Sequence, residues 1–267
     1  MATPKNSVQT CWGSRTADRL VAHGMERKNC PVTGAVMMDF LRPEFHGYYA
    51  NKQELCEKFN LDPKKELHLY ISSFGYASMT EQEVKELSEM AGTDFTGFAH
   101  TNRVSMGETL SWFDRYLGEH PEVELVYRRH PSEWNSPALL QLSKKRPNFH
   151  VIFERSVKDW IVAADSISIW MSTAIAEVYM AGKSCHILRP VPIEHEYDPV
   201  IYKNAHCVTN YQEFCESMSD RNPPFPIQKE VIEGYFDPSE QPAYKRMADL
   251  LEEVLKNPAR DEPMGEG

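Results

Sequence analysis

The sequence predicts an α/β fold: a Rossmann-like, doubly wound parallel sheet with helices on both faces. Short apolar runs rich in β-branched residues alternate with segments of helical spacing, the connections are short, and the alternation continues through most of the chain. Strands joined through a helix pair in parallel, and ligands bind beyond the carboxyl ends of such strands. The residues that follow each predicted strand are therefore the first candidates for a site.

The predicted elements follow one another in a regular order from residue 46 onward. A helix is expected at 46–60, a strand at 67–73, and helices at 81–91 and 103–119, with the polar, glycine-containing stretch 92–102 as a loop. Strands and helices then alternate: the strands at 123–128, 150–153, 166–170, 184–188 and 206–209, and the helices at 137–144, 157–164, 172–181 and 211–218. This order is typical of a parallel sheet covered by helices.

The two ends of the chain are predicted to lie outside this alternation. Residues 1–42 offer short apolar runs at 8–12 and 30–33 around a helix at 16–23, which is too little for a sheet that stands alone. We expect the remnant of another domain there, with a connector at 39–43 that ends at Pro43. The remaining boundaries are a main domain at 43–240, an amphipathic helix at 241–258 and a disordered tail at 259–267.

Composition limits the kinds of partner. The formal net charge of −10 argues against a nucleic-acid partner, because a phosphate backbone needs a basic face. Six cysteines without a CxxC pair favour free thiols in a reducing compartment, and no uninterrupted run of apolar residues reaches membrane-spanning length. We therefore expect a cytoplasmic protein. The acidic segment around Glu194 and Asp198 has no standard metal-ligand spacing, so no metal site is expected.

Two short signatures combine into one candidate site. Arg128-Arg129-His130-Pro131 ends a predicted strand, and Ser172-Thr173 opens a predicted helix after another strand. Cations at a strand end and hydroxyls at a helix start are the ingredients of an anion site. Glu177 lies about one turn further along the same helix face, where a carboxylate could accept hydrogen bonds from ribose hydroxyls. A nucleotide satisfies both halves.

Each of these residues also has a purely structural interpretation. His130-Pro131 could be an ordinary turn, and Ser172 and Thr173 suit helix capping without any ligand. We favour Arg128 or His130 at the phosphates, and we expect only one of the two adjacent arginines in the site because neighbours on an extended chain point to opposite faces. Glu177 lies among apolar residues and so needs a partner, although a solvated helix face is the alternative.

A weaker candidate is Ser73, in the segment Ser72-Ser73-Phe74-Gly75 that ends the strand at 67–73. Small residues at that point could lie near a diphosphate.

These motifs, in this order, resemble those of bacterial surface-carbohydrate biosynthesis proteins. They are Val32-Thr33-Gly34 through Asp39–Pro43, Ile71–Gly75, Arg128-x-His130-Pro131-Ser132-Glu133, and Ser172-Thr173 with Glu177 and Gly182-Lys183. The chain is similar to GT-B glycosyltransferases of capsule and lipopolysaccharide biosynthesis, related in style to capsule Kdo transferases and bacterial polysialyltransferases. It departs from their pattern at 35–38, where Asn-Pro-Arg-Phe is common, and at Arg129, where proline is common.

The resemblance implies a function for each part of the chain. The fold would be the carboxyl-terminal half of a GT-B fold, with residues 43–240 binding a nucleotide-sugar and 241–258 forming the crossing helix. His130 and Ser172 or Thr173 would contact the donor phosphates, and Glu177 the ribose.

The activity implied is metal-independent transfer of a sugar to a glycan acceptor in surface polysaccharide biosynthesis, with the nucleotide-sugar as substrate and no further cofactor. A partner chain supplying the acceptor domain and peripheral membrane association through the acceptor are expected, and no catalytic base is identified. A CDP-glycerol-type polyol-phosphate transferase, a truncated non-catalytic nucleotide-binding module and a sugar epimerase of the same fold remain as alternatives.

Overall fold

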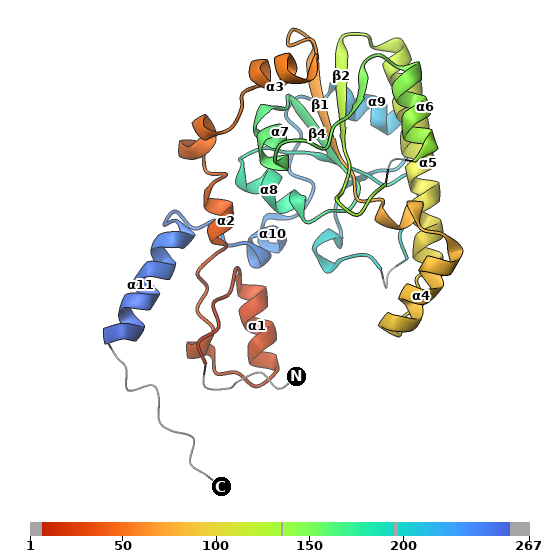
Figure 1. Cartoon of the computed structure of the whole chain (residues 1–267). Coiled ribbons are helices and arrows are strands. Elements are labelled where there is room, and N and C mark those ends of the chain that lie inside the picture. Colours follow the sequence, from red (N-terminus) through yellow and green to blue (C-terminus); the bar gives the residue numbers. More distant parts are fainter. Residues whose placement is uncertain (1–6, 135, 195–196, 257–267) are drawn as a thin grey trace. The chain divides into compact units, whose positions relative to one another are not determined.

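The structure, a computed structural model, describes residues 7–134, 136–194 and 197–256 (Figure 1). The predicted tail at 259–267 and the first six residues of the expected remnant lie outside the described residues. The chain forms two compact units. One consists of residues 43–228, and the other combines residues up to Arg42 with those from Lys229 onward.

The larger unit is built on a sheet of six parallel strands in the order β3-β2-β1-β4-β5-β6. This confirms the predicted Rossmann-like α/β fold. The strands are β1 (Glu66–Ile71), β2 (Val123–Arg128), β3 (Phe149–Val151), β4 (Ser166–Ile169), β5 (His186–Leu188) and β6 (Cys207–Val208). Because β1 pairs with β2 on one side and with β4 on the other, the strand order reverses at β1.

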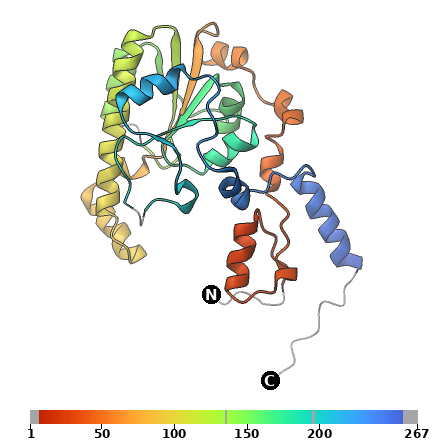
Figure 2. The ribbon, with the colours of Figure 1, turned by 180° about the vertical axis from the view of Figure 1, so that it is seen from behind.

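Helices cover both faces of this sheet, as Figures 1 and 2 show from opposite sides. One face carries α5 (Thr96–Glu119), α6 (Pro137–Lys145) and α9 (Tyr211–Ser219); the other carries α3 (Lys52–Phe59), α7 (Val157–Ala163) and α8 (Ala174–Met180). The helix α4 (Glu81–Ala91) precedes α5, and short 3-10 turns occur at Pro43–Tyr48, Gly75–Ser78 and Val200–Tyr202. An aromatic core between the sheet and α5 includes Tyr70, Phe113, Tyr127, Phe149 and Phe214.

The starts of two predicted helices in this unit are wrong by more than two residues. The helix expected at 46–60 begins only at Lys52, because Asn51 is an extended N-cap whose side chain accepts a hydrogen bond from the Glu54 amide in a capping box. The stretch 92–102 was expected to be a loop, but α5 begins at Thr96. Phe98 and Asn102 lie on its buried face, and small polar residues on that face hide the helical pattern from the sequence.

The smaller unit contains α1 (Ser14–Ala22), α2 (Val36–Asp39), α10 (Lys229–Tyr235) and α11 (Ala243–Lys256). In place of the two short strands, a single parallel bridge joins Cys11 and Val32. Two helices were not predicted: α2 directly precedes the expected connector at 39–43 and shares only Asp39 with it, and α10 is only seven residues long. The carboxylate of Asp39 accepts hydrogen bonds from the amides of Ala243 and Tyr244, both at 2.9 Å, and so caps the start of α11.

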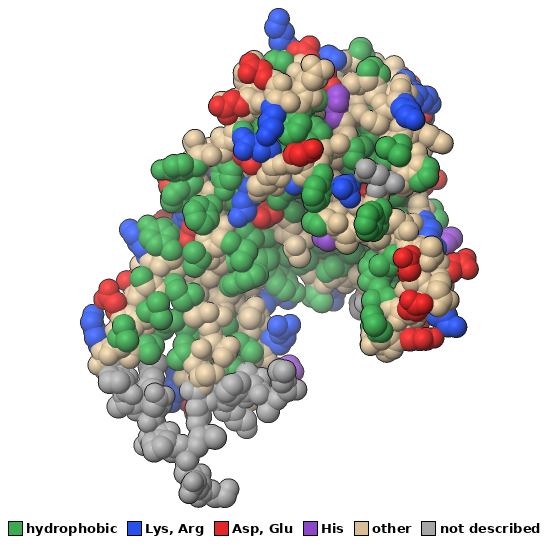
Figure 3. All heavy atoms as spheres, in the orientation of Figure 1, with side chains coloured by type: hydrophobic (Ala, Val, Ile, Leu, Met, Phe, Trp, Pro, Cys, Tyr) green, Lys and Arg blue, Asp and Glu red, His purple; other side chains and the backbone are tan. Residues whose placement is uncertain are grey.

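This unit also exposes apolar side chains. Hydrophobic side chains gather over α2 and α11 on the face shown in Figure 3, and the large exposed ones include Val36, Met37, Phe40, Tyr244, Leu251 and Leu255. Within the described ranges, no helix combines the length and the apolar character needed to cross a membrane.

Candidate functional site

A cavity of about 250 Å³ lies at the carboxyl ends of the central strands. It is where the reversal of strand order predicts a ligand site. The residues that line it come from the ends of β1, β2 and β4 and from α7 and α8: Ile71, Ser72, Arg128, Arg129, His130, Pro131, Phe153, Val157, Ser172, Thr173, Ala174 and Glu177. Both signatures, just over forty residues apart in the sequence, thus meet at one cavity.

Ser73 does not line this cavity. Its hydroxyl donates a hydrogen bond to the main-chain oxygen of Met171, so it joins the end of β1 to the residues that follow β4. In this position Ser73 supports the site rather than reaching into it.

His130 is exposed in a tight turn that its own side chain stabilises. The Glu133 amide donates to the His130 carbonyl at 2.9 Å, and the Ser132 amide and hydroxyl contact His130 Nδ1 at 3.2 and 2.7 Å. A ring nitrogen that accepts an N–H hydrogen bond cannot carry a proton itself, so the neutral imidazole carries its proton on Nε2. His130 therefore offers one N–H donor to a ligand.

Arg128 is engaged with the main chain. Its Nη1 donates to the carbonyls of Ile152 and Glu154 at 3.3 and 3.1 Å, and its Nη2 donates to the carbonyl of Arg155 at 2.6 Å. Burial lowers the pKa of Arg128, and the Glu154 carboxylate opposes that effect. The guanidinium thus holds the loop after β3, although Arg128 also lines the cavity, and the preference for Arg128 or His130 at the phosphates stays a prediction.

Arg129 corrects the expectation that only one of the two arginines reaches the site, because both line the cavity. The alternation of an extended strand does not apply to this pair, since β2 ends at Arg128. Arg129 lies over the Phe153 ring, 4.7 Å from its centroid, and its Nη1 donates to the Glu133 carbonyl. Its remaining N–H groups are available to an anion in the cavity.

The helix after β4 begins at Ala174 rather than at Ser172, and its first amides are largely satisfied. The Tyr202 hydroxyl accepts from the Ser172 amide at 2.8 Å and donates to the Ser172 carbonyl at 2.7 Å. The Ala174 amide donates to the Ser172 hydroxyl oxygen at 3.2 Å. The side chains of Ser172 and Thr173 line the cavity, so hydroxyl groups rather than a row of free amides face a ligand there.

Glu177 lines the cavity as well. Its Oε1 lies 4.0 Å from Lys158 Nζ, and both side chains are 19% exposed. Burial raises the pKa of Glu177, while Lys158 acts in the opposite direction. A half-buried carboxylate beside one cation retains acceptor capacity for hydroxyl groups.

Glu133 is a residue that the sequence analysis did not single out. It is 1% exposed, its carboxyl accepts a hydrogen bond from the Phe74 amide, and its two oxygens lie within hydrogen-bond distance of the Ser72 and Tyr127 hydroxyls. The sequence does place it three positions after His130, but a glutamate after a His-Pro pair resembles any polar turn. Only the structure shows that its side chain turns inward.

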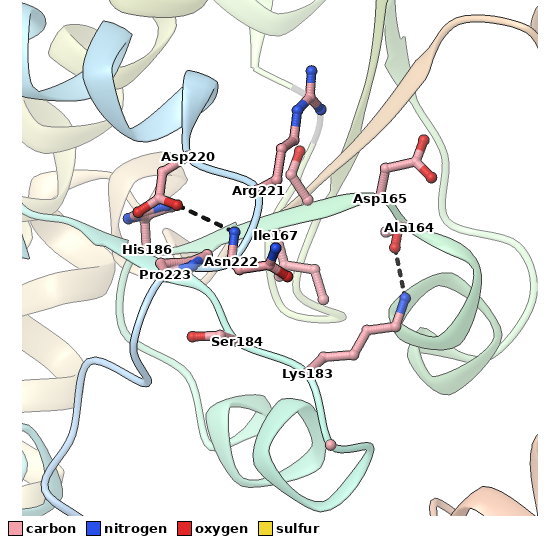
Figure 4. A pocket seen from close by; sticks show the side chains of 12 residues that line it. Ala164, Asp165, Ile167, Lys183, Ser184, His186, Asp220, Arg221, Asn222 and Pro223 are labelled. Atoms are coloured by element: carbon pink, nitrogen blue, oxygen red, sulfur yellow. Dashed lines mark hydrogen bonds between the residues drawn. The ribbon is translucent and has the colours of Figure 1, made fainter.

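A second cavity, of about 400 Å³, lies at the opposite, amino-terminal edge of the sheet (Figure 4). Its charged groups are directed toward the protein itself: Lys183 Nζ donates to the Ala164 carbonyl at 2.6 Å, and Asp220 accepts from the Asn222 amide at 3.1 Å. Arg221 pairs with Glu66. None of the predicted site residues lines this cavity, so the carboxyl-edge cavity remains the candidate site.

No group of three or more histidine, cysteine, aspartate or glutamate side chains is arranged to hold a metal ion among the described residues. His195 and Glu196, within the acidic segment considered from the sequence, lie outside them.

Comparison with known proteins identifies the fold. No family model matches the chain, and no curated protein matches it in sequence. Among solved structures, a UDP-N-acetylglucosamine 2-epimerase gives a TM-score of 0.52 at 13% identity over 96% of this chain and 59% of its own. The S. aureus MnaA–UDP co-structure gives 0.51 at 15% identity over 96% and 61%. The wall teichoic acid polymerase TagF gives 0.50 at 10% identity over 94% and 58%.

At this level of identity the likeness shows the fold alone, the Rossmann-like arrangement expected of a GT-B half. The chain spans 58–61% of the length of these three proteins.

Proposed function

We propose that this chain is the donor-binding part of a glycosyltransferase that acts in surface polysaccharide biosynthesis. It would bind a nucleotide-sugar and take part in transfer of the sugar to a glycan acceptor. One observation carries the proposal: cationic and N–H donors and the carboxylate of Glu177 line a single cavity at the carboxyl edge of a Rossmann-like sheet. This combination of groups matches a diphosphate joined to a ribose.

Each lining group has a role in this proposal. The Nε2–H of His130 and the guanidinium of Arg129 donate to the diphosphate, and the hydroxyls of Ser172 and Thr173 add further hydrogen bonds. Glu177 accepts from the ribose hydroxyls. A volume of about 250 Å³ is somewhat below the ~300–1,000 Å³ of typical ligand pockets. The cavity therefore holds the diphosphate and ribose, and the base and sugar extend beyond it.

The proposed chemistry is electrostatic. When the bond from the sugar to the diphosphate breaks, negative charge develops on the departing phosphate, and fixed donors aimed at that charge lower the barrier. His130 and Arg129 supply such donors, and no metal or further cofactor is required in this scheme. A base that activates the acceptor is still needed. We assign it to an acceptor domain provided by a partner chain, with any membrane association made through the acceptor.

Two alternatives share the same cavity. A CDP-glycerol-type polyol-phosphate transferase would place the same diphosphate against His130. The fold likeness to the teichoic acid polymerase TagF is the reason to retain this alternative. A non-catalytic nucleotide-binding module would bind the nucleotide without turnover. The fold is also shared with UDP-N-acetylglucosamine 2-epimerases, so the sugar product must be identified in any activity assay.

The first test is a thermal-shift panel with CMP, CDP, UDP, GDP and dTDP. A nucleotide at a hundred times its dissociation constant stabilises the protein by about 2.7 kcal/mol, which is a measurable rise in melting temperature. We expect His130→Ala and Glu177→Ala to lose this rise. His120→Ala and Glu122→Ala serve as matched controls, because both residues precede β2 at the other edge of the sheet.

Two outcomes would count against the donor site. If no nucleotide raises the melting temperature of the unaltered chain, the chain does not bind a donor by itself. If a nucleotide does so but both cavity variants respond like the unaltered chain, the ligand binds elsewhere. Radiolabelled transfer from the best nucleotide-sugar, with and without candidate acceptor domains, would then separate the transferase from the non-catalytic module.

A further inference from the structure

Three buried side chains beneath the His130 turn form a closed triangle of oxygen atoms. Ser72 ends β1, Tyr127 belongs to β2, and Glu133 follows the turn. Glu133 Oε2 lies 2.6 Å from Ser72 Oγ, Glu133 Oε1 lies 2.6 Å from Tyr127 Oη, and the two hydroxyl oxygens lie 2.7 Å apart. All three separations are those of O–H···O hydrogen bonds.

The number of hydrogens decides the protonation state of Glu133. Each of the three contacts needs one hydrogen between its oxygens, but the two hydroxyl groups supply only two. An ionised carboxylate would leave two oxygens in hydrogen-bond contact with nothing between them. A protonated Glu133 supplies the missing hydrogen, and all three contacts become hydrogen bonds.

The remaining contact fixes which oxygen carries the proton. The Phe74 amide donates to Glu133 Oε2 at 3.2 Å, so Oε2 is the carbonyl oxygen and accepts twice. Oε1–H then donates to Tyr127, the Tyr127 hydroxyl donates to Ser72, and the Ser72 hydroxyl donates back to Oε2. Every hydrogen bond in the ring runs in the same sense, which is the arrangement in which neighbouring bonds strengthen one another.

The surroundings of Glu133 favour the neutral acid. Its side chain is buried, and burial raises its pKa, against the smaller opposing effects of the hydrogen bonds to Ser72, Tyr127 and the main chain. The titratable groups near it are the buried phenols Tyr70 and Tyr127, whose own pKa values are raised by burial. Arg129 donates to the main-chain carbonyl of Glu133 and not to its carboxyl.

We propose that Glu133 is a neutral carboxylic acid and acts as the positioning residue of the anion site. Through Ser72 and Tyr127 it fastens the His130 turn to β1 and β2. Because it is uncharged, it does so without placing a negative charge beneath a bound diphosphate. This role rests on the proposed function for its ligand, although the protonation of Glu133 does not.

The variant that separates the possibilities is Glu133→Gln. Glutamine is uncharged and places an NH2 group at the position of Oε1–H and a carbonyl oxygen at that of Oε2, so it mimics the neutral acid and not the carboxylate. Tyr127→Phe is the companion variant: it keeps Glu133 but removes the acceptor of its proton. Glu133→Ala removes the whole anchor.

The protonation state is read by difference infrared spectroscopy at pH 7. The spectrum of the unaltered protein minus that of Glu133→Gln should show the C=O stretching band of a protonated carboxyl group. That band should shift in the spectrum of Tyr127→Phe. A carboxylate band in its place would overturn the proposal. This measurement needs no ligand, so it stands whether or not the chain binds nucleotides.

The positioning role is read from binding of inorganic pyrophosphate and of UDP by calorimetry. We expect Glu133→Gln to bind both within about twofold of the unaltered protein, and Glu133→Ala to lose about tenfold, which corresponds to ~1.4 kcal/mol. If Glu133 were ionised, Glu133→Gln would instead bind pyrophosphate more tightly, because a repulsive charge would be gone. Unchanged binding in Glu133→Ala would also overturn the role.

The two failures are distinguishable. A protonated carboxyl band together with no binding of either ligand removes the proposed function, and the positioning role with it, while the neutral acid stands. A carboxylate band with binding intact removes only the present inference.

Discussion

At the scale of single residues, the structure separates groups that hold the site from groups that face a ligand. Arg128 illustrates the first kind. Its planar guanidinium donates to the carbonyl groups of Ile152, Glu154 and Arg155 in one loop, and Arg155 has a left-handed backbone with φ of +67°. A residue committed to the main chain in this way defines the cavity wall and has little capacity left for a phosphate.

This assignment predicts the effect of Arg128→Lys. A lysine ammonium cannot reach three carbonyls in a fixed fork, so we expect the free energy of unfolding to fall by about 1 to 2 kcal/mol. Urea denaturation measures it. Arg103→Lys is the matched control, because exposed Arg103 donates to the single carbonyl of Met79. If Arg128→Lys kept its stability but bound UDP more weakly, Arg128 would instead be assigned to ligand binding.

Sequence patterns predicted which residues line the cavity better than they predicted the contacts that each of these residues makes. His130, Ser172, Thr173 and Glu177 follow strands or lie one helical turn on, and strand ends can be read from apolar runs. The engagement of the Ser172 amide by Tyr202 could not be predicted, because it depends on a contact across thirty residues. The inward turn of Glu133 is hidden for the same reason.

At the scale of elements, the best predictions are those where periodicity and capping agree. Helix α4 begins after Thr80, which forms a capping box with Glu83, and ends before Gly92 in the left-handed conformation. Its predicted bounds of 81–91 are confirmed. Helix α11 is a different case, since its pattern is in the sequence but its cap is not. The capping carboxylate of Asp39 lies two hundred residues earlier in the chain.

The cap of α11 gives a second prediction. Asp39→Ala removes the acceptor of two amides and the partner of Arg42, whose Nε lies 3.1 Å from Asp39 Oδ1. We expect a loss of about 2 kcal/mol, the upper end of capping effects.

Hydrogen exchange is the measurement for this cap, and it should show the loss concentrated in the amides of α11. Asp249→Ala, a change to an exposed carboxylate on the same helix, should leave exchange there nearly unaltered. Equal protection in the two variants would mean that α11 does not depend on this cap.

At the scale of the whole molecule, buried titratable groups make stability depend on pH. His68 in β1 is 1% exposed and lies between the hydroxyls of Ser166 and Ser168, each 2.7 Å from one ring nitrogen. Burial lowers the pKa of His68 to about 3. The unfolded chain binds a proton at this residue near pH 6.5, and the folded chain does not.

The sign of this linkage follows directly. Stability from His68 is fully present above its unfolded pKa of about 6.5 and is lost as the pH falls toward 3, by about 1.4 kcal/mol for each pH unit. Between pH 6.5 and 5 the free energy of unfolding should thus fall by about 2 kcal/mol more in the unaltered protein than in His68→Asn.

Urea denaturation at several pH values measures this difference, and exposed His100→Asn is the control. Parallel pH curves for the unaltered protein and His68→Asn would contradict the assignment. Glu133 acts in the opposite sense: because its pKa is raised, its contribution is present at low pH and declines as the pH rises.

The order of strands, which places the cavity, also sets a demand on the folding of the chain. Leu69 in β1 pairs with Val126 in β2 and with Ile167 in β4, partners that lie 57 and 98 positions later. Because a ribosome makes the chain from its amino end, the central strand β1 emerges before its two neighbours, and both of its edges stay unpaired until those distant segments are made. Such non-local pairing slows folding and exposes strand edges to other chains. The strand order that creates the binding site thereby leaves the nascent chain with unpaired strand edges for a time, and chaperones can bind it during that time.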